Sequence, residues 1–248
     1  MQTTEQIANL PNSLSLLNNA NFIQAFLSIA ANPNDSELQD YFKLEEVTRH
    51  LEEIQTCEYV EQLRLSPDMA EMIEQRYFGP EYKLEDLKNQ CPPGSLGYAY
   101  YHHMIENGIP AYDYSAFESP DDASYIKLRK MQTHDIWHVV TGYNADTLGE
   151  LALQGFYHGQ GATVYQTFLM SALVLHFATV ETKQLSLALE SLFEGWQRGR
   201  VARPLWAIRW EEMWNRPLAE IKEEYNILPL KELSRSEKIL SLKNLERQ

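Results

Sequence analysis

The chain has 248 residues, of which 44% are hydrophobic, which is enough for one well-buried core. Acidic residues outnumber basic ones by 35 to 21, and the net charge of −14 argues against nucleic acid as a partner. The same charge opposes docking to anionic lipid by electrostatics alone. Two cysteines, Cys57 and Cys91, provide no disulfide framework. Because neither a signal peptide nor an Arg-rich transit peptide is recognisable, we expect a cytoplasmic protein.

The first half of the chain reads as a series of helices. Apolar residues from Phe22 to Ile29 predict a helix that stops before Pro33, and a second helix is expected from Leu38. Ser66 followed by proline predicts a further helix start, because serine is a good N-cap and proline suits the first helical position. Ser119 and its following proline repeat that signal ahead of a helix of roughly 20 residues.

Later helices are expected over 163–180, 184–198 and 204–225, with the last interrupted at Arg216 and Pro217. The segment 163–180 has no Asp, Glu, Lys or Arg, yet its polar residues favour a buried central helix over a membrane span. Runs of alternating β-branched residues are missing from the sequence. We therefore predict an all-α, single-domain helical bundle over 1–228, with 229–248 as a charged C-terminal tail or helix.

The densest group of chemically active residues begins at His134. His134 and His138 are four residues apart, so they lie on one helix face, and Asp135 lies about 100° round from His134. Glu150 follows after a reversal for which Gly142 and a turn-forming run are suited. An antiparallel hairpin would return Glu150 to the histidines. The four side chains are therefore a predicted site for one divalent metal.

Each of these residues has an alternative role. Thr147 and Glu150 also fit a capping box, Asp135 fits an exposed position, and His138 fits a hydrogen-bonded core. Core packing gives no reason to group these residue types at one turn, so metal binding is the preferred interpretation. Two nitrogen and two oxygen ligands suit zinc, iron, manganese or cobalt, and the sequence does not choose among them.

Further motifs surround this group in a particular order. A PGSLG run precedes a Tyr-rich segment over 98–101, and the later part of the chain contains GWQRGRVA over 195–202 and WEEMW over 210–214. This order resembles the ubiquinone (coenzyme Q) biosynthesis protein 4 family, whose signature is HDxxH, eleven residues, and then E. The resemblance covers 90–228 well and the N-terminal third loosely.

The resemblance implies an all-helical fold and a divalent metal, usually described as zinc, held by His134, Asp135, His138 and Glu150. It implies a peripheral position on the inner membrane, a role in organising other quinone-biosynthesis proteins, and a polyprenyl lipid or quinone precursor as ligand. It also implies oxidative decarboxylation at ring carbon one of a polyprenyl-hydroxybenzoate. Asp113 begins Asp-Tyr-Ser where many members have Asp-x-Arg, and this difference, with the missing transit peptide, predicts a prokaryotic homologue.

Four further residues are candidates for substrate binding, each with a structural alternative. Gly155 and Tyr165 could line a slot for the prenyl tail, although such glycines also serve close helix packing. His158 falls two turns after Glu150 and could support the metal, but a lone histidine more often has a structural role. Arg200 could clamp a carboxylate or phosphate, or interact with a helix dipole.

Three functions remain open on this evidence. The first is a metal-dependent oxidative decarboxylase, and the second is a non-catalytic lipid-binding scaffold with a structural metal. The third is an HD-type phosphohydrolase, in which His102 or His103 would serve upstream, although no aspartate follows Asp146. Trp206, Trp210 and Trp214 are spaced as on a helix and are expected in the core. A homodimer is compatible with each of these functions.

Overall fold

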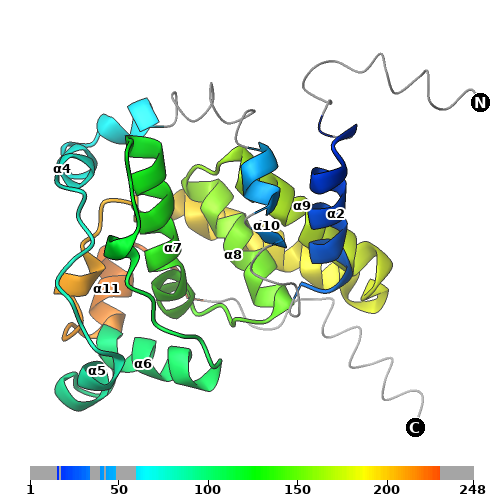
Figure 1. Cartoon of the computed structure of the whole chain (residues 1–248). Coiled ribbons are helices and arrows are strands. Elements are labelled where there is room, and N and C mark those ends of the chain that lie inside the picture. The colour runs from blue at the N-terminus through cyan, green and yellow to red at the C-terminus, as the bar shows by residue number, and fades with distance from the viewer. Residues whose placement is uncertain (1–15, 17, 34–39, 42, 49–59, 230–248) are drawn as a thin grey trace, which may run out of the picture.

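The computed structural model describes residues 16, 18–33, 40–41, 43–48 and 60–229, and within them the regular elements are helices (Figure 1). The all-α, single-domain prediction is confirmed for this part of the chain. The helix start predicted at Leu38, Cys57, and the predicted tail after Pro229 lie outside the described residues. Cys91 is buried and free.

The α-helices are α2 (Ala20–Ala31), α4 (Pro67–Gln75), α5 (Leu84–Gln90), α6 (Leu96–Glu106), α7 (Asp122–Thr141), α8 (Thr147–Gln160), α9 (Val164–Thr179), α10 (Leu185–Val201) and α11 (Leu218–Glu224). Short 3₁₀ turns are η2 (Tyr114–Ala116), η3 (Thr182–Gln184) and η4 (Trp210–Glu212).

Most helix ends follow the signals in the sequence. The α2 helix ends immediately before Asn32, and the α4 helix begins at Pro67 with Ser66 as its N-cap. The α7 helix has 20 residues, but its N-cap is Asp121 and not Ser119. Asp121 and Ser124 satisfy each other's backbone amides in a capping box, which a serine two residues earlier cannot reach.

The helix predicted before the interruption, over 204–215, is wrong, whereas the interruption at Arg216 and Pro217 is confirmed. Trp206 precedes η4, and Trp210 belongs to it, whereas regular α-helix resumes only at Leu218. Prolines at positions 204 and 217 remove amide donors, and the intervening backbone bonds elsewhere: Trp214 accepts from Gly97, and Arg216 accepts from Leu96. The three tryptophans are nevertheless buried, as their core assignment predicted.

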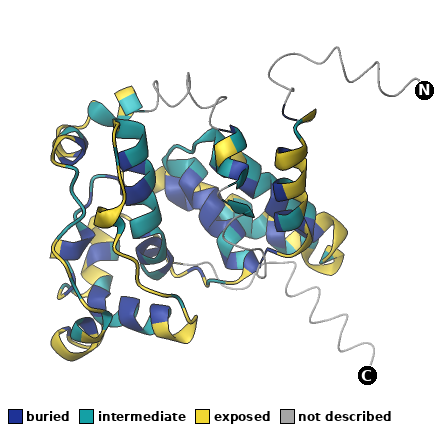
Figure 2. Ribbon diagram, in the orientation of Figure 1, coloured by how far each residue is buried: buried dark blue, intermediate teal, exposed yellow. Residues whose placement is uncertain are grey.

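Helices α8 and α10 pack closely because each has a glycine at their contact. A Cβ added to Gly155 of α8 would lie 2.2 Å from the carbonyl oxygen of Leu192 in α10. A Cβ added to Gly195 of α10 would lie 2.0 Å from the carbonyl oxygen of Ala152 in α8. These contacts bring the two backbones closer than any side chain would allow, and Figure 2 shows α8 as a largely buried helix.

The largest buried cluster joins α7 and α8 to the 202–227 region. The Trp137 ring lies 4.6 Å from the ring of Tyr157 and 4.7 Å from that of Trp206, measured between centroids. A second cluster joins α2 to α9, where Phe22 meets Phe168 edge to face at 5.0 Å. No helix among the described residues has the length and apolarity to cross a bilayer. The segment 163–180 therefore forms α9 within the bundle.

Candidate metal centre

The α7–α8 hairpin is built by local sequence. Gly142 ends α7 in the left-handed conformation, with φ of 80°, and its amide bonds to the carbonyl of His138. Asp146 then starts α8 by accepting a hydrogen bond from the Gly149 amide at 2.8 Å. A Cβ at Gly149 would lie 2.0 Å from the carbonyl oxygen of Asn144, so only glycine fits this tight reversal.

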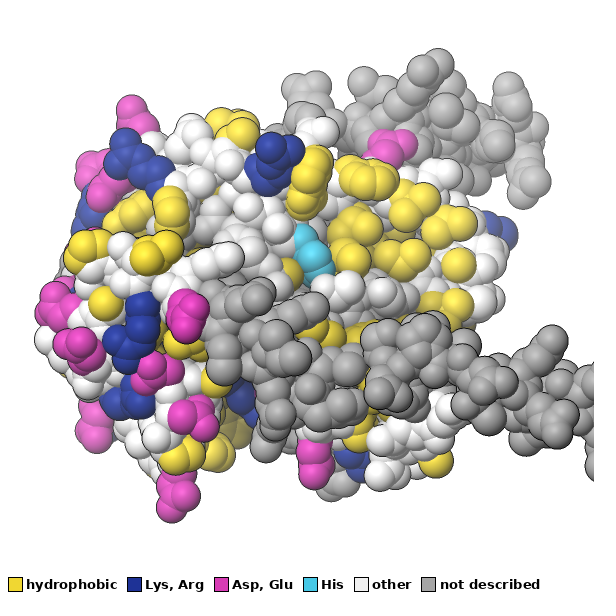
Figure 3. Space-filling model, turned by 90° about the horizontal axis from the view of Figure 1, so that it is seen from above, with side chains coloured by type: hydrophobic (Ala, Val, Ile, Leu, Met, Phe, Trp, Pro, Cys, Tyr) yellow, Lys and Arg dark blue, Asp and Glu magenta, His cyan; other side chains and the backbone are white. Residues whose placement is uncertain are grey.

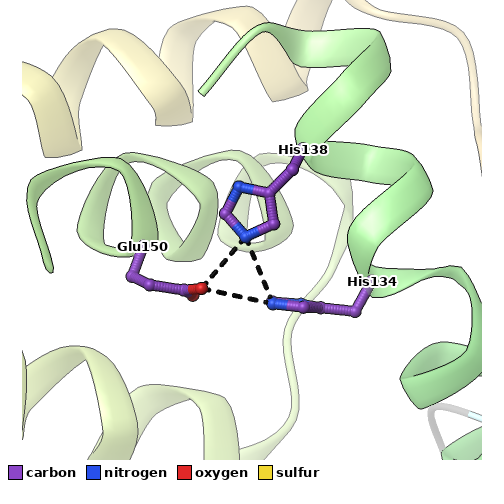
Figure 4. Close-up of side chains that lie close together, drawn as sticks. All are labelled: His134, His138 and Glu150. Atoms are coloured by element: carbon purple, nitrogen blue, oxygen red, sulfur yellow. Dashed lines mark hydrogen bonds and ion pairs between the residues drawn. The ribbon is translucent and has the colours of Figure 1, made fainter. Parts of the chain in front are cut away.

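The reversal brings three side chains to one point (Figure 4). Glu150 Oε1 lies 3.0 Å from His138 Nε2 and 3.4 Å from His134 Nε2. The two Nε2 atoms are 3.2 Å apart. Because Asp146 and not Thr147 is the N-cap, Glu150 is free of the predicted capping box and faces the histidines. The convergence of His134, His138 and Glu150 across the turn is as the sequence suggested.

The other nitrogen of each imidazole has a protein partner. His138 Nδ1 lies 3.1 Å from the Tyr143 carbonyl oxygen, which can only accept, so Nδ1 carries the hydrogen and Nε2 keeps its lone pair. His134 Nδ1 lies 3.3 Å from the hydroxyl of Tyr157. Such contacts fix the rings with their Nε2 atoms toward the centre, which is how metal-binding histidines are held.

The electrostatics of the centre favour a cation. Burial alone would lower the pKa of His134, but the carboxylates of Glu150 and Asp135 raise it to about 9. Burial alone would raise the pKa of Glu150, but the two imidazoles hold it well below its usual range. Two lone-pair nitrogens and a carboxylate oxygen within 4.8 Å of one another fit a divalent metal, since each is a ligand atom that metal ions use.

Asp135, the fourth predicted ligand, is placed differently. The three converging residues do not include it, and its Oδ1 lies 3.5 Å from Nε2 of His103 in α6. Burial alone would raise its pKa, but His103 and the two histidines of the centre lower it below the usual range. The His103 ring also lies nearly parallel to the His138 ring, with centroids 5.4 Å apart. From the sequence, His103 was a candidate only for the phosphohydrolase alternative, because no carboxylate lies at a matching spacing from it.

The slot predicted along Gly155 is corrected by the structure. The space beside this glycine is filled by the α10 backbone, so its role is the alternative one, close helix packing. His158 bridges two helices: its Nδ1 donates to the Gln154 carbonyl at 2.7 Å, and its Nε2 lies 3.2 Å from Thr167 Oγ1. It is not among the three converging residues.

Tyr165 and Arg200 lie in different surroundings. Lys130, one turn before His134 on α7, has its Nζ 5.6 Å from the Tyr165 ring and 5.7 Å from the Tyr157 ring. Tyr165 and Tyr157 thus both contact Lys130, and Tyr157 in turn contacts His134 of the centre. Arg200 is exposed and stacks on Trp196 at 4.7 Å, beside a cavity of about 430 Å³ whose lining includes Arg198 and Leu228.

A second polar cluster on α7 was not predicted. The Arg129 guanidinium pairs with both carboxylate oxygens of Glu211 from η4, and it also donates to the Ile208 carbonyl at 2.9 Å. The two side chains are 3% and 1% exposed, respectively, so the pair is sealed within the protein. Nothing in the spacing of these residues signals the pair, because it forms between distant parts of the chain.

Comparison with known families now identifies the chain. The family model described as coenzyme Q (ubiquinone) biosynthesis protein Coq4 matches residues 41–231. The chain belongs to the Coq4 family. The resemblance based on the signature and its flanking motifs is confirmed.

Similar Coq4 proteins occur in animals and fungi. The mitochondrial COQ4 homolog of Rattus norvegicus is 29% identical over 180 residues, covering 68% of this chain and 64% of that protein. The homolog of Danio rerio is 30% identical over 177 residues, covering 67% and 62%. The Uncinocarpus reesii protein is 28% identical over 141 residues, covering 55% and 49%. The chain thus spans about half to two thirds of the length of these relatives.

A solved structure shares the fold. A candidate ubiquinone biosynthesis protein from Nostoc punctiforme PCC 73102 aligns with a TM-score of 0.71 at 24% identity, covering 85% of this chain and 98% of that one. The agreement extends over most of the helical bundle. At this identity it concerns the fold and not the chemistry of the site.

Proposed function

We propose that this chain is a metal-dependent enzyme in the synthesis of ubiquinone or a related prenylquinone, acting at ring carbon one of a polyprenyl-hydroxybenzoate. The supporting observation is that three side chains, and not four, converge on the proposed metal position. Three protein ligands, with His134 and Glu150 about 30% exposed, leave room for a substrate atom. Catalytic metal sites are typically built in this open form, whereas structural zinc sites are closed by four protein ligands.

The roles of the residues follow from their positions. His134, His138 and Glu150 would hold the ion, and Tyr143 and Tyr157 would keep the two imidazoles oriented. When bound, the ion would supply Lewis-acid stabilisation of negative charge on the ring as carbon dioxide leaves. Zinc, iron, cobalt and manganese all suit this ligand set, and a redox metal would favour the oxidative half of the reaction.

A cation beside the centre suits an anionic ring substrate. Lys130 lies between the faces of Tyr157 and Tyr165, and it shares the α7 face with His134. In our proposal Lys130 binds the carboxylate of the substrate, and the rings of Tyr157 and Tyr165 pack against the aromatic ring of the substrate. Tyr165 would then contact the ring of the substrate, whereas the sequence had suggested a contact with its prenyl tail.

The apolar surface supports a lipid partner. On the face seen in Figure 3, most charged side chains lie toward the side that holds α4 to α7 in Figure 1, and hydrophobic side chains gather toward the opposite side. Ile23 and Leu27 of α2 are 40% and 51% exposed, and Phe193 of α10 is 59% exposed. We propose that this side receives the polyprenyl tail and meets the membrane surface peripherally. Contacts with other quinone-biosynthesis proteins, or with a second copy, belong to the same proposal.

The first test is the metal content of the purified chain by elemental mass spectrometry. Wild type is expected to hold one divalent ion per chain, and Glu150→Ala is expected to lose it while keeping its helical circular dichroism. His102→Ala is the matched control, because His102 is exposed on α6 and pairs with Glu106. A metal-free wild type, after reconstitution with each of the four candidate metals, would contradict the proposal.

The second test is turnover. A short-chain prenyl-hydroxybenzoate labelled at its carboxyl carbon is supplied with oxygen, and released labelled carbon dioxide is counted. Release that depends on the metal and on Glu150 would support the enzyme. Bound metal without release, together with tight binding of the lipid, would favour the scaffold with a structural ion.

A further inference from the structure

His103 belongs to a helix outside the metal hairpin, yet its side chain reaches the centre. It lies on α6, and its side chain is only 11% exposed, whereas that of the adjacent His102 is 40% exposed. Its ring lies at 21° to the His138 ring, with centroids 5.4 Å apart. With the Tyr143 carbonyl on Nδ1, this contact restricts rotation of the His138 ring about its Cβ–Cγ bond.

The other contact of His103 is with the signature aspartate. Nε2 of His103 is buried, has no hydrogen-bond partner of good geometry among the described residues, and lies 3.5 Å from Asp135 Oδ1. The Asp135 side chain is itself only 19% exposed. A carboxylate at this depth needs a compensating donor or charge, and His103 is positioned to supply it.

The helix that carries His103 is firmly attached. The amides of Leu96 and Gly97, in the first turn of α6, bond to the carbonyls of Arg216 and Trp214 at 2.9 and 2.8 Å. A Cβ at Gly97 would lie 2.6 Å from Cys91 Sγ, so this turn also packs closely against its neighbours. The helix that carries His103 is therefore held in place at its first turn.

We propose that His103 is a positioning residue of the metal centre, which orients the Asp135 carboxylate and the His138 ring from α6. This inference rests on the proposed metal site and extends it to a residue outside the signature. Groups that orient metal ligands from behind commonly change metal affinity 10- to 100-fold when they are removed. His103 acts through Asp135 and His138 and is not itself one of the three converging ligands.

The experiment measures metal affinity on the purified full-length chain by competition with a chromophoric chelator, using Zn²⁺ and Co²⁺. His103→Phe keeps the ring size but removes both nitrogens, and we expect affinity to fall about 10- to 100-fold. The visible absorption of bound Co²⁺ should also change, because that spectrum reports ligand geometry. His103→Gln restores a donor toward Asp135 and should recover part of the affinity.

Two controls separate positioning from general stability. His102→Phe makes the same change at the neighbouring exposed position and should leave both affinity and spectrum at wild-type values. Thermal unfolding of each metal-free variant reports whether the fold survives. Asp135→Asn, alone and combined with His103→Phe, completes a double-mutant cycle, in which the losses should be less than additive if His103 acts through Asp135.

Unchanged affinity and an unchanged Co²⁺ spectrum in His103→Phe would overturn the inference while leaving the proposed metal site intact. If His103→Phe does not fold, His103→Ala decides, because it removes both the ring and the donor, and a wild-type spectrum and affinity there would overturn the inference. A wild type that binds neither metal would instead remove the proposed function, and this inference with it.

Discussion

Two polar clusters on α7 begin five residues apart, at Arg129 and His134, and have opposite designs. Arg129 and Glu211 form a buried pair in which the guanidinium meets both carboxylate oxygens, with both side chains almost fully enclosed. His134, His138 and Glu150 instead converge on a shared point, and two of the three side chains are partly exposed. The first cluster balances its own charge. The second gathers two imidazole nitrogens and a carboxylate oxygen at one point, where a proton on His134 or a metal ion can hold them together.

The difference distinguishes a structural ion pair from the proposed metal site by geometry alone. A buried ion pair is complete within the protein, and removing one member leaves an unpaired charge. The histidine–glutamate group is partly exposed and presents ligand atoms to the proposed ion, so its loss should change metal binding and leave the fold. The following predictions test that contrast.

The largest expected effect is at the buried pair. Glu211→Ala leaves the Arg129 guanidinium without its carboxylate and should lower the free energy of unfolding by about 3–5 kcal/mol. Urea unfolding followed by circular dichroism measures this. Arg129→Met combined with Glu211→Leu should cost much less than Glu211→Ala, because no charge is left buried. A cost below about 1 kcal/mol for the single variant would contradict the structural role.

Metal removal should have a smaller effect on the fold. At a metal concentration 100 times the dissociation constant, bound metal adds about 2.7 kcal/mol to the free energy of unfolding. A chelator should remove this increment from wild type and leave Glu150→Ala unchanged, with the helices retained in both. Complete unfolding of wild type on chelation would instead identify a structural ion.

Metal affinity should depend on pH through His134. Its pKa of about 9 means that the metal-free protein holds a proton there at neutral pH, which the metal must displace. Apparent affinity should therefore rise about tenfold per pH unit up to that value, as competition titrations at three pH values would show. For the metal-free fold the sign is reversed: the stability conferred by the raised pKa is full below the ordinary histidine value of 6.5 and is lost as pH rises through about 9. A flat affinity profile would show that His134 is not a ligand.

The smallest effect is expected at Asp122, the first residue of α7. Burial alone would raise its pKa, but Arg64 and Arg76 lower it below the usual range. This contribution to stability is present above the ordinary aspartate pKa of 3.8 and is lost as pH falls through the lower folded value. Asp122→Asn should cost about 1 kcal/mol or less at pH 7, because the site is partly exposed, and the cost should shrink in acid. Acid titrations of the two proteins would measure it.

The three converging residues could be predicted because helical spacing and one turn bring them together. His134 and His138 share a face by helical spacing, and Gly142 signalled the turn that returns Glu150. The contact of His103 with Asp135 could not be predicted, because it depends on how α6 packs against α7. The same holds for Arg129 and Glu211, which meet across 82 positions of sequence.

The fold shows a similar division. The start of α4 was placed correctly from its serine–proline pair, although the Ser66 side chain makes no capping hydrogen bond and Pro67 alone sets the first helical position. The 204–225 segment was predicted as a helix interrupted at Pro217, but backbone bonds to the start of α6 and the earlier Pro204 give the part before Pro217 an irregular path. Glycines of α8 were open to two interpretations, and only the approach of α10 decided between them.

The glycine contact between α8 and α10 has a consequence for ion selectivity. Glu150 lies in the first turn of α8, and that helix is held against α10 with no side chain between the backbones at Gly155 and Gly195. A helix seated in this way has little freedom to slide outward. The distance between the Glu150 carboxylate and the two imidazoles should therefore vary little. The site should bind small ions such as zinc and cobalt and disfavour larger ones such as calcium.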